Sequence, residues 1–259
     1  MKQETGGTPT NADPVRQQHT QGTQQRSLRR FPASYGLIGL TLLVFVLQTL
    51  STQITQYDWF ILFGAKVNGA IAAGQIWRFI TPIFLHAGLW HVGVNMYSLY
   101  AIGPSIERFF GSIRMAVIYL LSGISGVIFS LAFSTAPSVG ASGAIFGLLG
   151  ALATFLYRHR QTFGAAGRFH LRQILLVAVI NLGIGLMPQI DNWGHLGGLI
   201  GGVLLTWFIG PRFEVHFSLE GQPVLQDHRP WQQARRYALL GLVLLSALAC
   251  LATLNSLRQ

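Results

Sequence analysis

Charged residues are scarce in this sequence of 259 residues: 10% are Asp, Glu, Lys or Arg, whereas 51% are hydrophobic. An average soluble domain has roughly 25% charged residues, so these few charges cannot cover a surface that faces water. Acidic residues are the scarcest, with 8 Asp and Glu against 18 Lys and Arg. The single cysteine, Cys250, excludes an intrachain disulfide and a cysteine-based metal cluster. The composition therefore predicts an integral membrane protein.

Charge-free stretches long enough to cross a bilayer recur along the chain. A bilayer core of about 30 Å needs a helix of about 20 residues. The charge-free windows are 31–57, 79–106, 115–157, 173–190, 192–211 and 237–257. The third window is too long for one span, and Ser134-Thr135-Ala136-Pro137-Ser138 interrupts it with turn-forming residues. The pattern therefore predicts an all-α, polytopic helical bundle with seven spans.

The excess of basic residues is unevenly distributed along the chain. If the N-terminus is cytoplasmic, only three of the 18 basic residues fall outside, namely Lys66, Arg78 and Arg258. Such a bias matches the positive-inside rule. We therefore interpret the basic charge as a topology signal rather than as a nucleic-acid site. It predicts a cytoplasmic N-terminus and, after seven spans, a C-terminus outside.

The segments between the spans suggest four regions. Residues 1–34 are rich in Gln, Thr, Gly and Arg and lack apolar periodicity, which predicts a disordered cytoplasmic tail. Residues 35–210 hold six spans and form the core. Residues 211–236 form a polar cytoplasmic linker, and residues 237–259 hold the seventh span with a short outer tail.

Four polar side chains fall at a similar depth in this topology. Spans two, four and six all run from outside to inside. His91 and Asn95 lie near the start of span two, Ser142 near the start of span four, and His195 near the start of span six. Polar residues inside a membrane are costly and are therefore functional candidates. Packing could explain each of them alone, because a small Ser between glycines and an Asn in a span commonly serve helix contacts. Their shared outer level favours a common site.

The residue types suit acyl transfer. A serine hydroxyl becomes a useful nucleophile when a neighbouring base accepts its proton, and histidine suits that role. Ser142 and His195 would form such a dyad. His91 and Asn95 could donate hydrogen bonds to the oxyanion of the tetrahedral intermediate, together with the backbone N–H of Ser142 at a helix N-terminus. Glycines at spacing four in span six would let span four approach closely, and Phe146 could pack against the His195 ring.

The ordered motifs resemble the rhomboid intramembrane serine proteases over roughly residues 36–210. They are Trp77-Arg78, His91-x-x-x-Asn95, Glu107-Arg108 with Gly111, Gly140-Ala141-Ser142-Gly143, and His195-x-x-Gly198-x-x-x-Gly202. The resemblance implies an endopeptidase that cuts transmembrane segments near the outer face, with Ser142 as nucleophile, His195 as general base, and His91 and Asn95 at the oxyanion. It also implies a six-helix core with a seventh C-terminal helix.

The resemblance extends to partners and location. It implies transmembrane protein substrates in a lipid bilayer, and we expect no nucleic acid, no metal and no other cofactor. Mitochondrial members usually carry their extra helix at the N-terminus, so we expect a bacterial inner membrane here.

Other classes of membrane protein or hydrolase would require other residues. A zinc protease would need His-Glu-x-x-His and an aspartyl protease two intramembrane aspartates, and the sequence has neither. A soluble hydrolase elbow would need a glycine where Ala144 stands. A transporter would need polar residues along a path through the membrane. A rhomboid-like protein that binds transmembrane clients without cutting them stays open as the alternative.

Four further positions have assigned roles. Asp191 lies four residues before His195 and could complete a triad, although the resemblance implies a dyad and a loop position is expected. Glu107 is expected to form a structural ion pair. His86 is expected to make a structural hydrogen bond rather than bind a metal. Trp77-Arg78 is expected to anchor the outer loop at the interface.

Overall fold

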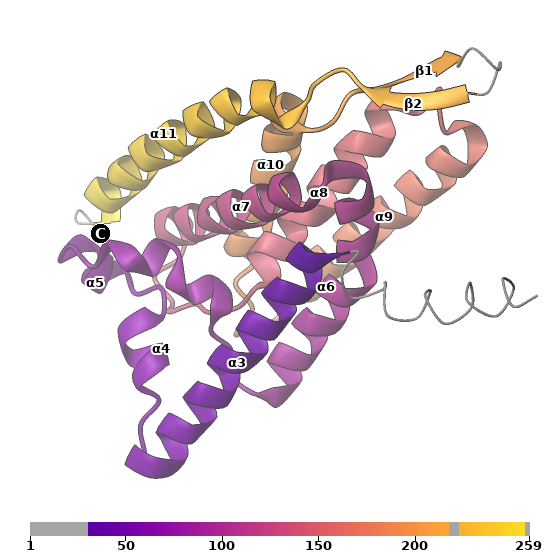
Figure 1. The fold of residues 1–259 in the computed structure, drawn as a ribbon. Coiled ribbons are helices and arrows are strands. Elements are labelled where there is room, and N and C mark those ends of the chain that lie inside the picture. The colour runs from indigo at the N-terminus through magenta and orange to yellow at the C-terminus, as the bar shows by residue number, and fades with distance from the viewer. Residues whose placement is uncertain (1–30, 218–222, 257–259) are drawn as a thin grey trace, which may run out of the picture.

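The computed structural model describes residues 31–217 and 223–256, so most of the predicted tail lies outside the described residues. Each of the seven predicted spans corresponds to a long helix (Figure 1). These helices are α3 (Pro32–Thr55), α6 (Leu89–Phe110), α7 (Ser112–Phe133), α8 (Ser142–Arg158), α9 (Gly164–Ile184), α10 (Asn192–Ile209) and α11 (Trp231–Ser256). Four of them, α3, α7, α9 and α11, are long and apolar enough to cross a membrane. The predicted fold class, a mostly helical polytopic membrane protein, is confirmed.

Short elements fill the connections, and some were not predicted. Between α3 and α6 lie α4 (Trp59–Gly64), α5 (Asn68–Ala72), and the 3-10 helices η1 (Ile76–Phe79) and η2 (Thr81–Phe84). Strands β1 (Phe213–Phe217) and β2 (Pro223–Asp227) form an antiparallel hairpin in the segment 211–236, which was expected to be only a linker. The last helix begins at Trp231, six residues before the predicted span.

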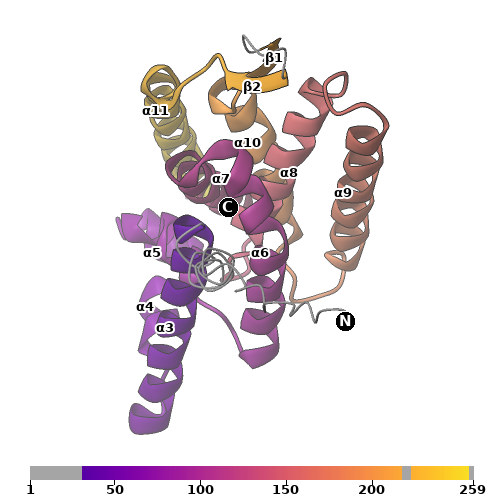
Figure 2. The ribbon, with the colours of Figure 1, turned by 45° about the vertical axis from the view of Figure 1, so that its right-hand side comes forward.

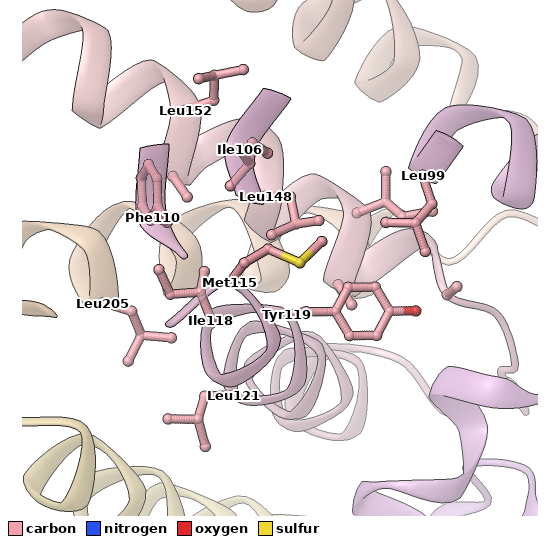
Figure 3. Close-up of a cluster of buried hydrophobic side chains, with 14 of the residues drawn as sticks. Leu99, Ile106, Phe110, Met115, Ile118, Tyr119, Leu121, Leu148, Leu152 and Leu205 are labelled. Atoms are coloured by element: carbon pink, nitrogen blue, oxygen red, sulfur yellow. The ribbon is translucent and has the colours of Figure 1, made fainter. Parts of the chain in front are cut away.

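Helices α7, α8 and α10 form the centre of the bundle (Figure 2). The hairpin lies at one end of the bundle, and the connection between α3 and α6 lies at the other (Figure 1). Between these ends, Leu99, Ile106, Met115, Tyr119 and Leu148 are fully buried in one cluster (Figure 3). This core joins α6, α7 and α8 and fixes the helices that carry the candidate site.

The outer helices expose apolar side chains. In the most apolar window of α7, 61% of the residues are buried, against 11% in each of α3, α9 and α11. Large exposed apolar surfaces are rare on soluble monomers. On a membrane protein such surfaces can face the lipid tails, which are themselves apolar, so their exposure is not unfavourable.

Candidate active site

Two side chains from different helices meet in a hydrogen bond at one end of the bundle. Ser142 is the first residue of α8, and His195 lies in the first turn of α10. The Ser142 Oγ and His195 Nε2 atoms are 2.8 Å apart, although 53 residues separate them in sequence. Both residues are partly buried. The geometry allows the hydroxyl to pass its proton to the imidazole.

Glycines bring α8 and α10 close enough for this contact. A Cβ atom placed on Gly198 or Gly202 would overlap the backbone of Gly143 or Gly147, respectively. The two helices therefore touch backbone to backbone, as small residues permit in membrane helices. The expected approach of span six to span four is confirmed.

The His195 ring is held by packing rather than by a carboxylate. Phe146 stacks on it with ring centroids 4.5 Å apart and planes 14° apart, as predicted. Asp191 instead caps α10, because its Oδ1 accepts a hydrogen bond from the Gly194 N–H at 2.9 Å. Within residues 31–217 and 223–256, the buried His195 Nδ1 has no hydrogen-bond partner. The observed arrangement is therefore a pair, without Asp191 as a third member.

His91 and Asn95 lie on α6, beside the loop that leads to Ser142. The His91 ring faces Gly140, since a Cβ atom on that glycine would lie 2.8 Å from His91 Nε2. Asn95 is buried, and its Nδ2 donates to the His91 carbonyl at 2.9 Å, within its own helix. The structure thus brings His91 to the site, while the Asn95 donor is engaged one turn away.

The loop before Ser142 has a backbone that only glycine suits well. Gly140 has φ +134°, in the region that L side chains rarely adopt. Its N–H donates to the Pro82 carbonyl at 2.9 Å, which ties the loop to η2. His86 Nε2 accepts from the Ala141 N–H at 3.4 Å, so the expected structural hydrogen bond of His86 is confirmed.

His86 is neutral in this position. Burial, with a smaller contribution from the neighbouring His91, lowers its pKa to about 4. A protonated ring would set an N–H against the Ala141 N–H. The neutral form is therefore the one that supports the loop before Ser142.

Lys66 also holds this loop, and no sequence pattern singled it out for that role. It is fully buried, and its Nζ donates to the carbonyls of Ser134 at 2.7 Å and Ala136 at 3.0 Å. Its backbone pairs with Ser138 in an isolated bridge. Burial lowers the Lys66 pKa to about 8, and the charge of Asp191 partly opposes that shift. The connection between α3 and α6 is thus bound to the segment that positions Ser142.

Trp77 and Arg78 make hydrogen bonds that hold the connection between α3 and α6 together. Arg78 is buried and donates to the carbonyls of Ala65 at 2.5 Å and Leu62 at 2.8 Å. Trp77 is exposed, and its Nε1 donates to the Phe63 carbonyl at 2.8 Å. These hydrogen bonds confirm the expected role in fixing this loop, whereas its place at the membrane interface stays a prediction.

The predicted ion pair of Glu107 is wrong. Its carboxylate accepts from the Ala33 N–H, the Ser34 N–H and hydroxyl, and the Ser112 hydroxyl, at 2.6–2.9 Å. No basic side chain in the described part of the chain lies within ion-pair distance of it. The first N–H groups of a helix lack intrahelical acceptors, so Glu107 serves as the acceptor for the start of α3.

A small cavity adjoins Ser142 and His195. Its volume is about 30 Å³, and Pro82, Val139 and Gly194 are among the residues that line it. That volume can hold one or two water molecules.

The start of α8 offers free backbone donors. The Ile145 N–H makes the first hydrogen bond of α8, to the Ala141 carbonyl, so the N–H groups of residues 142–144 have no acceptor within the helix.

The fold and the site define a polytopic membrane protein with a serine–histidine pair near one end of its helical bundle. Residues 73–212 match the Rhomboid domain, which covers more than half of the chain. The chain belongs to the rhomboid family.

The curated relatives include one protein named as a rhomboid protease and others named as rhomboid-like proteins. Rhomboid protease GluP of Bacillus subtilis (strain 168) is 43% identical over 178 residues, which are 68% of this chain and 34% of that protein. RHOMBOID-like protein 1 of Arabidopsis thaliana is 37% identical over 177 residues, 64% of this chain and 45% of that protein. RHOMBOID-like protein 7 of the same plant is 42% identical over 155 residues, 56% of this chain and 49% of that protein. The chain thus spans about a third to a half of the length of these relatives.

Proposed function

We propose that this chain is an intramembrane serine endopeptidase that cleaves transmembrane segments of membrane proteins near the outer face. The observation that carries the proposal is the 2.8 Å contact between Ser142 Oγ and His195 Nε2. A serine at the start of an apolar helix can pack against a neighbouring helix without a hydrogen bond to a histidine. Paired with a base, it becomes a nucleophile.

Acylation proceeds in two proton transfers. Ser142 Oγ attacks the carbonyl carbon of the scissile peptide bond, while His195 Nε2 accepts the hydroxyl proton. The tetrahedral intermediate then collapses, the C–N bond breaks, and His195 gives the proton to the leaving amine. Phe146 holds the imidazole plane during both transfers through its stacked contact.

The oxyanion of the intermediate is stabilised at the start of α8. The N–H groups of residues 142–144 lack acceptors in the helix, and the helix dipole adds positive potential there. His91 faces Gly140 beside this point. Asn95 adds a further donor when its amide turns from the His91 carbonyl, to which it donates in the free protein.

A water molecule completes the reaction. The cavity beside Ser142 and His195 can hold it, and His195 removes its proton as it attacks the ester carbon. The acyl group leaves with the water oxygen, and Ser142 recovers its proton.

Before acylation, a substrate helix must unwind near the outer surface, because a peptide carbonyl within a helix is already hydrogen-bonded.

The decisive experiment is cleavage of a test substrate with one transmembrane segment by the purified protein in detergent. We expect the wild type to cut it, and Ser142→Ala and His195→Ala to lose more than about 1,000-fold in rate. His170→Ala, which removes an exposed histidine on α9, is the matched control and retains activity. Equal cleavage by wild type and Ser142→Ala would refute the nucleophile assignment.

The competing function is that of a client-binding protein that does not cut. It would bind transmembrane segments equally well with Ser142→Ala, and no product would form with the wild type. The Ser142–His195 hydrogen bond favours the protease, because a binding protein has no use for an aligned nucleophile and base.

A further inference from the structure

Three side chains of types that can ligate a metal lie close together in the segment that joins α10 to α11. Figure 1 shows the hairpin in this segment. Glu214 and His216 belong to β1, and His228 follows the last residue of β2. One ligand atom from each lies within 4.8 Å of the other two. The Nε2 atoms of the two histidines are 2.8 Å apart, and His228 Nε2 lies 3.6 Å from Glu214 Oε2.

The strand register puts all three on one face. Side chains two residues apart in a strand share a face, as Glu214 and His216 do. The His228 N–H donates to the Arg212 carbonyl at 2.8 Å, which extends the ladder beyond the Phe213–Asp227 pair. Residue 228 therefore lies opposite residue 212, on the same face as 214 and 216.

The distances are close to those of a tetrahedral zinc site. Zinc binds imidazole nitrogen at about 2.0–2.1 Å and carboxylate oxygen at about 2.0–2.2 Å, so neighbouring ligand atoms lie about 3.3 Å apart. The histidine pair must open by about half an ångström, and the Glu214 oxygen must approach His228 Nε2 by a few tenths. The Glu214 and His216 ligand atoms lie within 4.8 Å of each other and must also come to about 3.3 Å. All three side chains are exposed and free to make such adjustments.

We propose that the hairpin binds one Zn²⁺ ion through His216 Nε2, His228 Nε2 and a Glu214 carboxylate oxygen, with water as the fourth ligand. Imidazole nitrogen favours zinc over Mg²⁺ and Ca²⁺, which prefer all-oxygen sites. The site is distinct from the Ser142–His195 pair, because that pair lies at the starts of α8 and α10, whereas the hairpin follows the end of α10.

The ion would stabilise the β1–β2 hairpin. A two-stranded hairpin is only marginally stable alone. Here its base is held where Asp227 pairs with Arg114 at 3.0 Å and the Phe213 N–H donates to His159 Nε2 at 2.9 Å. Zinc would add a tie between β1 and the residue that leads into α11.

Calorimetric titration of Zn²⁺ into the full chain, purified without a histidine tag, tests the site near neutral pH. We expect one saturable site, with affinity lowered at least about 10-fold in His216→Ala and in His228→Ala. His170→Ala is the control, since it removes an exposed histidine from α9 and leaves the hairpin intact. Absence of saturable binding, or equal binding by the two hairpin variants and the wild type, would overturn the proposal.

Hydrogen exchange supplies a second measurement. Zinc should slow amide exchange in β1 and β2 of the wild type and leave His216→Ala unchanged. Exchange in α7 and α8 should be the same in both proteins, which would show that the variant is folded. Equal zinc protection of the hairpin in both proteins would also contradict the proposed ligands.

Discussion

The contact between α8 and α10 can be tested by adding one methyl group. Gly198 lies one turn after His195 on α10, and its Cα faces the backbone of Gly143 on α8. In Gly198→Ala, the new Cβ would lie 2.7 Å from the Gly143 carbonyl carbon and 3.0 Å from its Cα, and it would overlap the carbonyl oxygen. Backbone atoms cannot rotate away, so the helices must separate.

The size of the effect follows from these distances. Carbon atoms pack at about 3.5–4.0 Å, so α10 must move from α8 by roughly 1 Å. The same movement lengthens the Ser142–His195 hydrogen bond from its 2.8 Å. A misplacement of about 1 Å can cost about 100-fold in rate. Overpacking should cost about 1–3 kcal/mol in stability, partly offset by about 1 kcal/mol of helix propensity.

Cleavage rate and thermal unfolding should be measured together on the same preparations. We expect Gly198→Ala to lose about 100-fold in rate while it remains folded. Gly39→Ala on α3 is the matched control, because its Cβ would meet nothing within 4 Å. If Gly198→Ala cleaves as fast as Gly39→Ala, the close approach of the helices does not position the dyad.

Three further outcomes are expected. Asp191→Asn keeps an N-cap side chain on α10, so its cleavage rate should stay within a few-fold of wild type, whereas a triad member would lose about 10,000-fold. Glu107→Ala removes the acceptor for three hydrogen bonds at the start of α3 and one from Ser112 of α7, and should lower stability by about 2–4 kcal/mol in denaturant or thermal unfolding; an unchanged midpoint would contradict that role. His86 has a folded pKa of about 4, below its unfolded value, so the unfolded chain binds the extra proton. Stability should therefore fall as pH drops from about 6.5 to about 4, by up to about 3 kcal/mol, and His86→Gln should flatten this profile.

The long helices could be predicted from the sequence because the membrane imposes a simple rule. A span must be apolar over its length, and the charge-free windows located all seven helices. Charge bias predicted that Ser142 and His195 lie at one level, which agrees with their contact, and the glycine spacing on span six predicted the helix contact. These signals are local in sequence or averaged over many residues.

The connections could not be predicted in the same way. The Lys66 contacts with Ser134 and Ala136 join segments about 70 residues apart, and no local pattern encodes that pairing. Each strand of the hairpin has only five residues, and although β1 alternates apolar and polar residues, β2 (Pro-Val-Leu-Gln-Asp) does not. Glu107 was expected to form an ion pair. Backbone and hydroxyl donors at the start of α3 satisfy it equally well.

The central claim is that His195 activates Ser142 as a nucleophile. Intact-mass measurement after treatment with an organophosphorus fluoride, which reacts with activated serines, tests it most directly. We expect one adduct on the wild type, mapped to Ser142, none on Ser142→Ala, and strongly slowed labelling of His195→Ala. An adduct that forms equally fast on Ser142→Ala, or labelling at Ser142 that does not depend on His195, would contradict the claim.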